Sequence, residues 1–247
     1  MIERLENTEL VKELFDGWEE TMIYSCMQGV MGDIYVTDTK HPGAAQAYLG
    51  DFCFFAGEPC RELVGHKQDF VIMASQSEAW EKEIEACWGE RAKRVVRYAI
   101  KKNTVFDEEK LRAYAADLPE GYRLHALDDE VYEKCLANDW SKDLVSVFQG
   151  KEEYLQKGLG VVALKGEELV AGASSYTRYR EGIEIEVDTR ADERRRHLAT
   201  ACCAGLILEC LKRGLYPSWD AQNWNSVCLA EKLGYEFSHE YAVYEVY

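Results

Sequence analysis

The sequence predicts a mixed α/β (α+β) protein in which a smaller α/β domain precedes a domain with a mixed, mostly antiparallel central sheet. Three observations support this fold class. Short apolar segments with alternating or continuous patterns, typical of strands, interleave with segments whose apolar residues recur every three or four positions. The alternating segment 183–188 runs through an arginine-rich turn into a long apolar helix that begins at Leu198. A three-stranded meander precedes that segment, and a strand, a helix and further strands follow it.

Strand and helix patterns alternate in the first half. Residues 8–27 carry apolar side chains at helical spacing, and Ser77 is expected to cap a second helix. Strands are predicted at 33–37, at 44–56 with a turn at Gly50-Asp51, at 70–74 and at 94–101. This half has no phosphate loop, catalytic triad or metal-ligand spacing, so its aromatic residues are interpreted as core.

The second half begins after a short polar helix at 107–116 and a turn at 117–121. This turn sets the predicted domains at 1–120 and 121–247, the first of which is expected to cover or shape the binding cleft of the second. Elements are then predicted in the following order: strand 122–127, a helix capped by Asp128 or Asp129, helical residues 141–155, strands 159–164, 169–178 and 183–188, the helix from Leu198, strand 216–220, a helix capped by Asn223 or Asn225 and ended by Gly234, and one or two strands within 235–247. No internal repeat relates the two halves convincingly at the level of sequence.

Composition limits the functional classes. The chain has 247 residues and a formal net charge of -16, which argues against non-specific binding to nucleic acid or anionic membranes. The charge weakly favours cationic partners such as amines, although solubility alone would also explain it. Nine cysteines without CxxC spacing and five histidines without ligand spacing give no support for a metal site. No signal peptide or 18-residue apolar stretch is visible, which predicts a cytoplasmic protein. The oligomeric state is left open, a homo-oligomer included.

Four arginines crowd the turn between strand 183–188 and the helix from Leu198. A strand, a tight loop and a buried helix leave unpaired backbone N–H groups at the positive end of the helix dipole, which is a typical anion site. A solvated surface loop is the alternative, because Asp188, Asp192 and Glu193 could pair with the arginines.

The segment Arg194-Arg-Arg-His-Leu-Ala199 resembles the acyl-CoA loop of the GCN5-related N-acetyltransferases, Arg/Gln-x-x-Gly-x-Gly/Ala. The segment Trp219–Tyr235 is similar to the closing motif of that family, Asn-x-x-Ser/Ala-x-x-Leu-Tyr-x-Lys-Leu-Gly-Phe. Including Tyr216-Pro-Ser-Trp-Asp220, the likeness is nearest to the zwittermicin-resistance-type subgroup. The resemblance covers about residues 122–247, and it implies transfer of an acetyl group from acetyl-CoA, as co-substrate, to a primary amine of a small molecule.

Two positions depart from the family pattern. His197 stands where the motif usually has Gly, so the loop is not expected to need a conformation that only Gly tolerates. Ala230 stands where many members carry the Tyr that protonates the leaving thiolate. Water, Ser226 or one of Tyr235, Tyr241 and Tyr244 could take over that role, and the sequence does not choose among them.

The resemblance also implies which residues hold the cofactor. Backbone amides of 195–200 would cradle the pyrophosphate with help from arginine side chains, and the backbone near Val187 and Thr189 would pair with the pantetheine arm. Asn223 matches the family residue that binds this arm, although it could also be a plain helix cap. The full predicted set is Val187, Thr189, Arg194, Arg195, Arg196, His197, Leu198, Ala199, Thr200, Asn223 and Ser226.

Two carboxylates are candidates for the general base. Glu184 and Glu186 share one strand face, where either could take the amine's proton, and Asp220 is a further candidate. They could instead face solvent or pair with Arg178 or Arg180. No cysteine has a recognisable partner, which predicts direct attack without a covalent intermediate. A non-catalytic acyl-CoA sensor or interaction protein remains an alternative, as does a transferase that modifies peptide or protein amines.

Overall fold

The structure, a computed structural model, describes residues 1–66 and 69–247. It contains two compact units: unit 1 comprises Met1–Arg97 and Glu240–Tyr247, and unit 2 comprises Tyr98–His239. This division differs from the predicted boundary at 120–121. Residues 98–120 group with unit 2 because Tyr98, Phe106, Leu111 and Tyr114 pack into its core.

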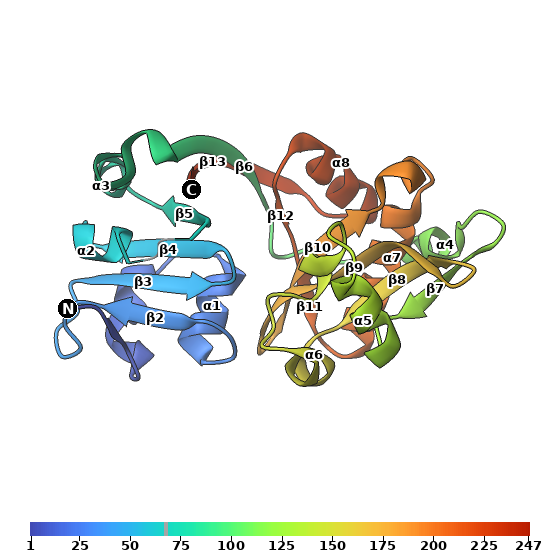
Figure 1. The fold of residues 1–247 in the computed structure, drawn as a ribbon, viewed down its shortest axis with the longest axis horizontal. Helices are drawn as coiled ribbons and strands as arrows, with labels where there is room; N and C mark the ends of the chain where they lie inside the picture. The colour runs from blue at the N-terminus through green and yellow to red at the C-terminus, as the bar shows by residue number, and fades with distance from the viewer. Residues whose placement is uncertain (67–68) are drawn as a thin grey trace. The chain divides into compact units, whose positions relative to one another are not determined.

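Unit 1 is a sheet with helices (Figure 1). Its strands are β1 (Glu3–Arg4), β2 (Asp33–Val36), β3 (Ala44–Leu49), β4 (Phe52–Gly57), β5 (Val71–Ser75), most of β6 (Ala92–Ile100) and, from Glu240 on, β13 (Phe237–Val246). Its helices are η1 (Thr8–Phe15), α1 (Thr21–Gln28), α2 (Arg61–Val64), α3 (Glu78–Trp88) and η2 (Gly89–Arg91). Aromatic and aliphatic side chains from β4, β5, α2 and α3 form a core that includes Phe55, Met73, Trp80 and Ile84.

Unit 2 is built around one long helix. Its strands are β7 (Tyr122–Ala126), β8 (Gly160–Lys165), β9 (Glu168–Tyr179), β10 (Gly182–Thr189), β11 (Tyr216–Ser218), β12 (Asp220–Ala221) and the start of β13 (Phe237–Val246). Its helices are α4 (Glu108–Ala116), α5 (Asp129–Leu136), η3 (Lys142–Leu144), α6 (Lys151–Lys157), η4 (Ala191–Glu193), α7 (Leu198–Lys212) and α8 (Trp224–Leu233). Helix α7 is almost wholly apolar, and it packs against β8, β9 and β10 on one side and α4 on another.

The two units repeat one topology that the sequence analysis did not detect. The strand order is β1-β2-β3-β4-β5 in unit 1 and β7-β8-β9-β10-β11 in unit 2. In each unit the first four strands pair antiparallel, and the last pair, β4 with β5 or β10 with β11, is parallel. The final strands are exchanged, because β13 pairs with β5 and β6 pairs with β12. The predicted mixed, mostly antiparallel sheet is therefore confirmed.

Three predicted segments are divided in the structure. The helix expected within 8–27 is a 3-10 helix followed by α1, with Gly17 between them at φ 72. Residues 141–155 form η3 and the start of α6 rather than one helix. The strand expected at 216–220 is split at Trp219, because β11 pairs with β10 while β12 pairs with β6. This last split creates the fork at which the candidate site lies.

Candidate active site

The site is organised by a fork between two parallel strands. Strand β11 pairs with β10 over only three positions, which end at the pair Glu184 and Ser218. Beyond that point β10 continues to Thr189 with β9 on one side and, among the described residues, no strand on the other. The chain after Ser218 turns away to pair with β6. The last five residues of β10 therefore present an open strand edge.

Backbone amides on this edge are covered by neighbouring side chains. The N–H of Val187 donates to Oε1 of Glu186 at 3.1 Å, and the N–H of Thr189 donates to the carboxylate of Asp188. The hydroxyl of Thr189 is buried and has no hydrogen-bond partner in the described part of the chain. An extended ligand with carbonyl groups could replace the two carboxylates on these amides, much as an added strand would.

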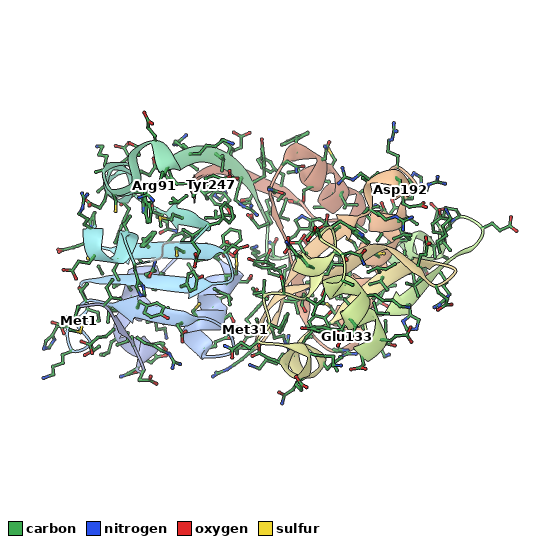
Figure 2. The ribbon with its side chains drawn as sticks, in the orientation of Figure 1. Met1, Met31, Arg91, Glu133, Asp192 and Tyr247 are labelled. Atoms are coloured by element: carbon green, nitrogen blue, oxygen red, sulfur yellow. The ribbon has the colours of Figure 1, made fainter. Side chains whose placement is uncertain are left out.

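The arginine loop leads from this edge to the start of α7. Asp192, labelled in Figure 2, lies in the short turn η4, and the loop then passes through Arg195 and His197, both with φ 63. The loop thus takes the left-handed conformation that Gly favours and that His also adopts, in agreement with the expectation that position 197 needs no conformation restricted to Gly; the cost is about 1–2 kcal/mol. No side chain caps α7, so its first backbone N–H groups remain available to an anion.

Charges in the loop separate into paired and available groups. Glu193 is buried and contacts Lys165 Nζ at 2.8 Å, Arg196 Nε at 3.0 Å and the hydroxyl of Tyr122 at 2.5 Å. The hydrogen bond from Lys165, followed by that from Tyr122, holds the pKa of Glu193 below its ordinary value. Arg190 pairs with Asp192 at 2.7 Å. The alternative of internal pairing is thus correct for Arg190 and Arg196.

Arg194 and Arg195 are the loop cations that remain. Arg194 donates to the carbonyl of Thr189 at 3.3 Å, which holds the loop against the end of β10. The side chain of Arg195 makes no hydrogen bond or ion pair with the described residues. His197 lies 3.3 Å from Asp117, which follows α4. The loop therefore keeps a positive group beside the uncapped end of α7.

The acidic residues of β10 share the face away from α7. Ile183 and Ile185 belong to the core around α7 and Val187 packs against it, so the alternating residues Glu184, Glu186 and Asp188 point to the other face. Helix η3 covers that face at Gly172, which pairs with Asp188, because a Cβ there would lie 2.6 Å from Leu144. Three carboxylates therefore line one face of the fork strand.

The surroundings of these carboxylates differ. Glu184, at the fork, is buried and lies 3.9 Å from Lys102 Nζ. Glu186 lies at the open edge on the Val187 amide. Burial, followed by the nearby charge of Asp143, raises the pKa of Asp188 to about 6. Arg178, the suggested alternative partner, donates to the carbonyl of Gly182 at 2.9 Å.

The start of α8 lies beside the strand that leaves the fork. Asn223 caps the helix by accepting from the Ser226 N–H at 3.1 Å, and the hydroxyl of Ser226 accepts from Trp219 Nε1 at 3.0 Å. Ala230 is buried in the core around α7. The hydroxyl of buried Tyr235 donates to the carbonyl of Pro217 at 2.7 Å, whereas Tyr244 donates to Glu85 within unit 1.

Comparison with known proteins identifies the fold. A sequence profile of GNAT acetyltransferases matches residues 12–244. The chain belongs to the GNAT acetyltransferase family. A GCN5-related N-acetyltransferase-like protein from Streptococcus suis 89/1591 is 46% identical, with a TM-score of 0.93 and coverage of 98% of this chain and 99% of that one. The uncharacterized N-acetyltransferase YdfB of Bacillus subtilis (strain 168) is 24% identical over 253 residues, which cover 95% of this chain and 94% of that protein.

A more distant likeness extends over the whole length of the chain. A tandem GNAT protein from the clavulanic acid biosynthesis pathway is 10% identical, with a TM-score of 0.55 and coverage of 100% of this chain and 98% of that one. At this identity the likeness is one of fold alone. It agrees with the repeated topology of units 1 and 2.

Membership of the GNAT family makes acetyl transfer the reaction of this protein. The described part of the chain holds no group of three or more His, Cys, Asp or Glu side chains suited to a metal ion. None of the described helices is both long and apolar enough to span a bilayer. Burial raises the pKa of the α7 thiols Cys202, Cys203 and Cys210, that of Cys210 to about 12, so they are poor nucleophiles.

Three parts of the site were not found from the sequence. Lys102 comes from the segment between β6 and α4, far from either motif. Thr177 of β9 pairs with Glu184, and its buried hydroxyl has no hydrogen-bond partner among the described residues. Glu193 was considered only as a partner for arginines, although it is the buried centre of the loop's ion pairs. Only the buried contacts in the folded chain distinguish these residues, and no spacing in the sequence indicates them.

Proposed function

We propose that the protein transfers the acetyl group of acetyl-CoA to a primary amine of a small molecule. The observation that carries this proposal is the fork at Glu184 and Ser218, whose open edge leads directly to the uncapped amino end of α7. An extended, anionic thioester would satisfy both features at once. The narrower likeness to zwittermicin-resistance-type enzymes and the role of the amino-terminal half remain predictions.

The residues present fit acetyl-CoA, which supplies an activated acetyl thioester when bound. The amides of Val187 and Thr189, now covered by carboxylates, would pair with the pantetheine arm, and the buried Thr189 hydroxyl would gain a partner. Amides of residues 195–200 and the Arg194 and Arg195 side chains would hold the pyrophosphate. Asn223 and Ser226 lie at the start of α8, where the family motif places the contact to this arm.

The acidic face of β10 supports a cationic acceptor. Glu184, Glu186 and Asp188 share this face, and η3 adds Asp143 near Asp188. An ammonium group would be attracted there and must lose a proton before it can attack. We assign Glu184 as the general base, because it lies at the fork while Glu186 lies on an amide that the pantetheine arm would take.

The raised thiol pKa values support direct attack of the amine on the thioester. The ammonium first gives one proton to Glu184, and the neutral amine then attacks the thioester. The C–N bond forms, the C–S bond breaks with its electron pair on sulfur, and the second proton from nitrogen reaches that sulfur through water to complete the thiol. Removal of a general base of this kind costs about 10²–10⁴-fold in rate. Glu184→Gln should therefore lower kcat much more than Glu186→Gln.

Calorimetric titration with acetyl-CoA tests the proposal. Wild type should bind at micromolar concentrations, and Arg195→Gln should bind about tenfold more weakly, because a charge-assisted hydrogen bond is worth about 1.5–3 kcal/mol before solvent screening. Arg213→Gln is the matched control, since Arg213 lies at the other end of α7 and pairs with Glu209. Absence of binding to the wild type would refute the proposal.

A thiol-release assay then separates acceptor classes. Small mono- and diamines form one panel, and peptides with free amino groups form the other. Turnover of small amines with Glu184-dependent kcat supports the proposed function. Turnover of peptides alone would indicate that the enzyme modifies peptide or protein amines. Binding of acetyl-CoA without turnover of either panel would favour a sensor.

A further inference from the structure

Lys102 connects both strands of the fork. It lies in the segment between β6 and α4, and its side chain is only 17% exposed. Its ammonium nitrogen is 2.7 Å from Ser218 Oγ on β11 and 3.2 Å from the Trp219 carbonyl just beyond it. The same nitrogen is 3.9 Å from Oε2 of Glu184 on β10. One cation therefore contacts the last paired residue of each strand.

The chemistry of the group explains why the contact is specific. An ammonium has three donors and no acceptor, and here it meets a hydroxyl, a carbonyl and a carboxylate. Glu184 is buried, and burial of a carboxylate without a partner is costly. The nearby ammonium offsets that cost, and its two neutral acceptors on the β11 side fix where the positive charge lies. Loss of the cation would remove this compensation from a buried carboxylate.

A neighbouring hydroxyl supports an occupant on this face. Thr177 of β9 pairs directly with Glu184, so the two side chains share one face of the sheet. Thr177 is fully buried, and its hydroxyl has no hydrogen-bond partner among the residues that the structure describes. A buried hydroxyl without a hydrogen-bond partner is unfavourable unless a ligand satisfies it. A polar amine substrate that reaches Glu184 would therefore also lie close to the Thr177 hydroxyl.

We infer that Lys102 is a positioning residue of the acetyl transfer, which holds Glu184 ionised and aimed at the attacking amine while it binds the β11 side of the fork. This inference rests on the proposed function and adds a residue that lies outside the two motif segments 194–199 and 219–235. Lys102 moves no proton itself. It acts by keeping the Glu184 carboxylate charged and in place, so that the carboxylate is ready to accept the proton from nitrogen.

The pH profile of kcat/KM is the readout that a purely structural role would not change. Without the ammonium the charged carboxylate is less favoured, so Glu184 should take up its proton at higher pH. The acidic limb of the profile, where kcat/KM falls as the base becomes protonated, should therefore move to higher pH. Tyr235 also lies within electrostatic range of Glu184. Burial raises the pKa of Tyr235, so it stays neutral over the range measured.

The experiment compares Lys102→Met and Lys102→Arg with Lys101→Met. Lys101 is the matched control, because it is adjacent in sequence, exposed, and paired with Glu236 at 2.5 Å away from the fork. We expect Lys102→Met to lower kcat/KM for the amine by about 10–100-fold and to shift the acidic limb to higher pH. Lys102→Arg should keep the position of the limb because it keeps the charge, and acetyl-CoA affinity should stay within about twofold.

Two results would overturn the inference while leaving the proposed function intact. One is a folded Lys102→Met enzyme with an unchanged limb and unchanged kcat, which would make Lys102 a structural contact only. The other is a Glu184→Gln enzyme with wild-type turnover, which would leave Lys102 with no base to position; it would also refute the assignment of Glu184 as base, while acetyl transfer to the amine would stand. If Lys102→Met does not fold, Ser218→Ala removes one ammonium contact and should give the same shift in smaller measure; an unshifted limb there would also refute the inference. Failure of wild type to bind acetyl-CoA would instead refute the proposed function.

Discussion

Units 1 and 2 share one order of elements but differ where their parallel strands end. In unit 1 the end of β4 is closed by Trp80, whose Nε1 donates to the Gly57 carbonyl at 2.9 Å and whose ring stacks on Phe55 at 5.0 Å. In unit 2 the corresponding end of β10 is open and leads to the arginine loop. The helix after the parallel strand has four residues in unit 1 and fifteen in unit 2. The fold alone therefore does not make the site.

The difference is concentrated at one helix position. Ser77 caps α3 and Asn223 caps α8, each by accepting from the N–H three residues later. That third residue is Trp80 in unit 1 and Ser226 in unit 2. Trp80 packs on Phe55 beside β4, whereas Ser226 accepts a hydrogen bond from Trp219. We propose that the size of the side chain at this position helps to keep the edge filled in unit 1 and open in unit 2.

The largest expected effect is that of Trp80→Ala. Trp80 is 1% exposed, and truncation of a buried aromatic side chain costs about 3–5 kcal/mol. We expect the free energy of unfolding of unit 1 to fall by that amount in urea titration, with acetyl-CoA affinity unchanged. Trp80→Phe, which loses chiefly the bond to Gly57, should cost about 1 kcal/mol. Weaker acetyl-CoA binding by a folded Trp80→Ala protein would show that unit 1 takes part in the cofactor site.

The reverse substitution, Ser226→Trp, should close the open edge of unit 2. An indole at this helix position would occupy the β10 edge as Trp80 occupies that of β4. Acetyl-CoA affinity in calorimetry should fall at least about a hundredfold, or about 2.7 kcal/mol. Ser226→Ala is the control; it loses the bond from Trp219 but should bind within a few-fold of wild type. Unimpaired binding by Ser226→Trp would contradict the equivalence of the two positions.

The sequence predicted the part of the site that is continuous in the chain. The strand–loop–helix segment around Arg194 has a period-2 pattern, a charged turn and an apolar run, and each of these reports local structure. The division of strand 216–220 at Trp219 was not predictable, because it depends on β12 pairing with β6 rather than on any local preference. The strand, loop and helix around the fork can therefore be predicted from local sequence, whereas the fork itself depends on tertiary strand pairing.

Long-range contacts account for the remaining misses. Lys102 reaches Glu184 only because the segment after β6 is brought beside β11, and no residue pattern records that approach. The repeat was also missed, because β4 reads Phe-Cys-Phe-Phe-Ala-Gly whereas β10 carries three carboxylates. The apolar side chains of β4 belong to a filled strand edge, whereas the carboxylates of β10 form a polar face. The two units therefore share their strand order without a recognisable likeness in sequence.

A smaller effect concerns the carboxylates that only unit 2 carries. Burial, and then Asp143, raises the pKa of Asp188 to about 6, against about 3.9 for an unfolded chain. The folded state therefore holds this proton more tightly, so stability is lost as pH rises from about 4 to 6 and the loss is complete above 6. Asp188→Asn should remove the loss and raise Tm by a few degrees at pH 7.5, with little change at pH 4.

Asp192→Asn is the matched control for that pH dependence. The hydrogen bond from Arg190 lowers the pKa of exposed Asp192, so its carboxylate stabilises the folded state above about pH 4. Asp192→Asn should therefore lower Tm slightly at pH 7.5, the opposite sign to Asp188→Asn. A stabilising effect of Asp188→Asn that is equal at pH 4 and pH 7.5 would rule out titration as its cause.

The smallest effect tests how the two units make the turn after their fourth strand. Unit 1 ends β4 with Gly57 at φ 80, whereas unit 2 places the non-glycine residues Arg195 and His197 at φ 63. His197→Gly should relieve about 1–2 kcal/mol of left-handed strain, offset by about 0.5–1 kcal/mol of added chain entropy in the unfolded state. Tm should therefore rise slightly and acetyl-CoA affinity should be retained, while His197→Ala, which keeps the strain, should lower Tm. If both variants lose the same stability, the exposed contact from His197 to Asp117 contributes more than the backbone conformation costs, and the loop is held by its side chains as well as by its turn.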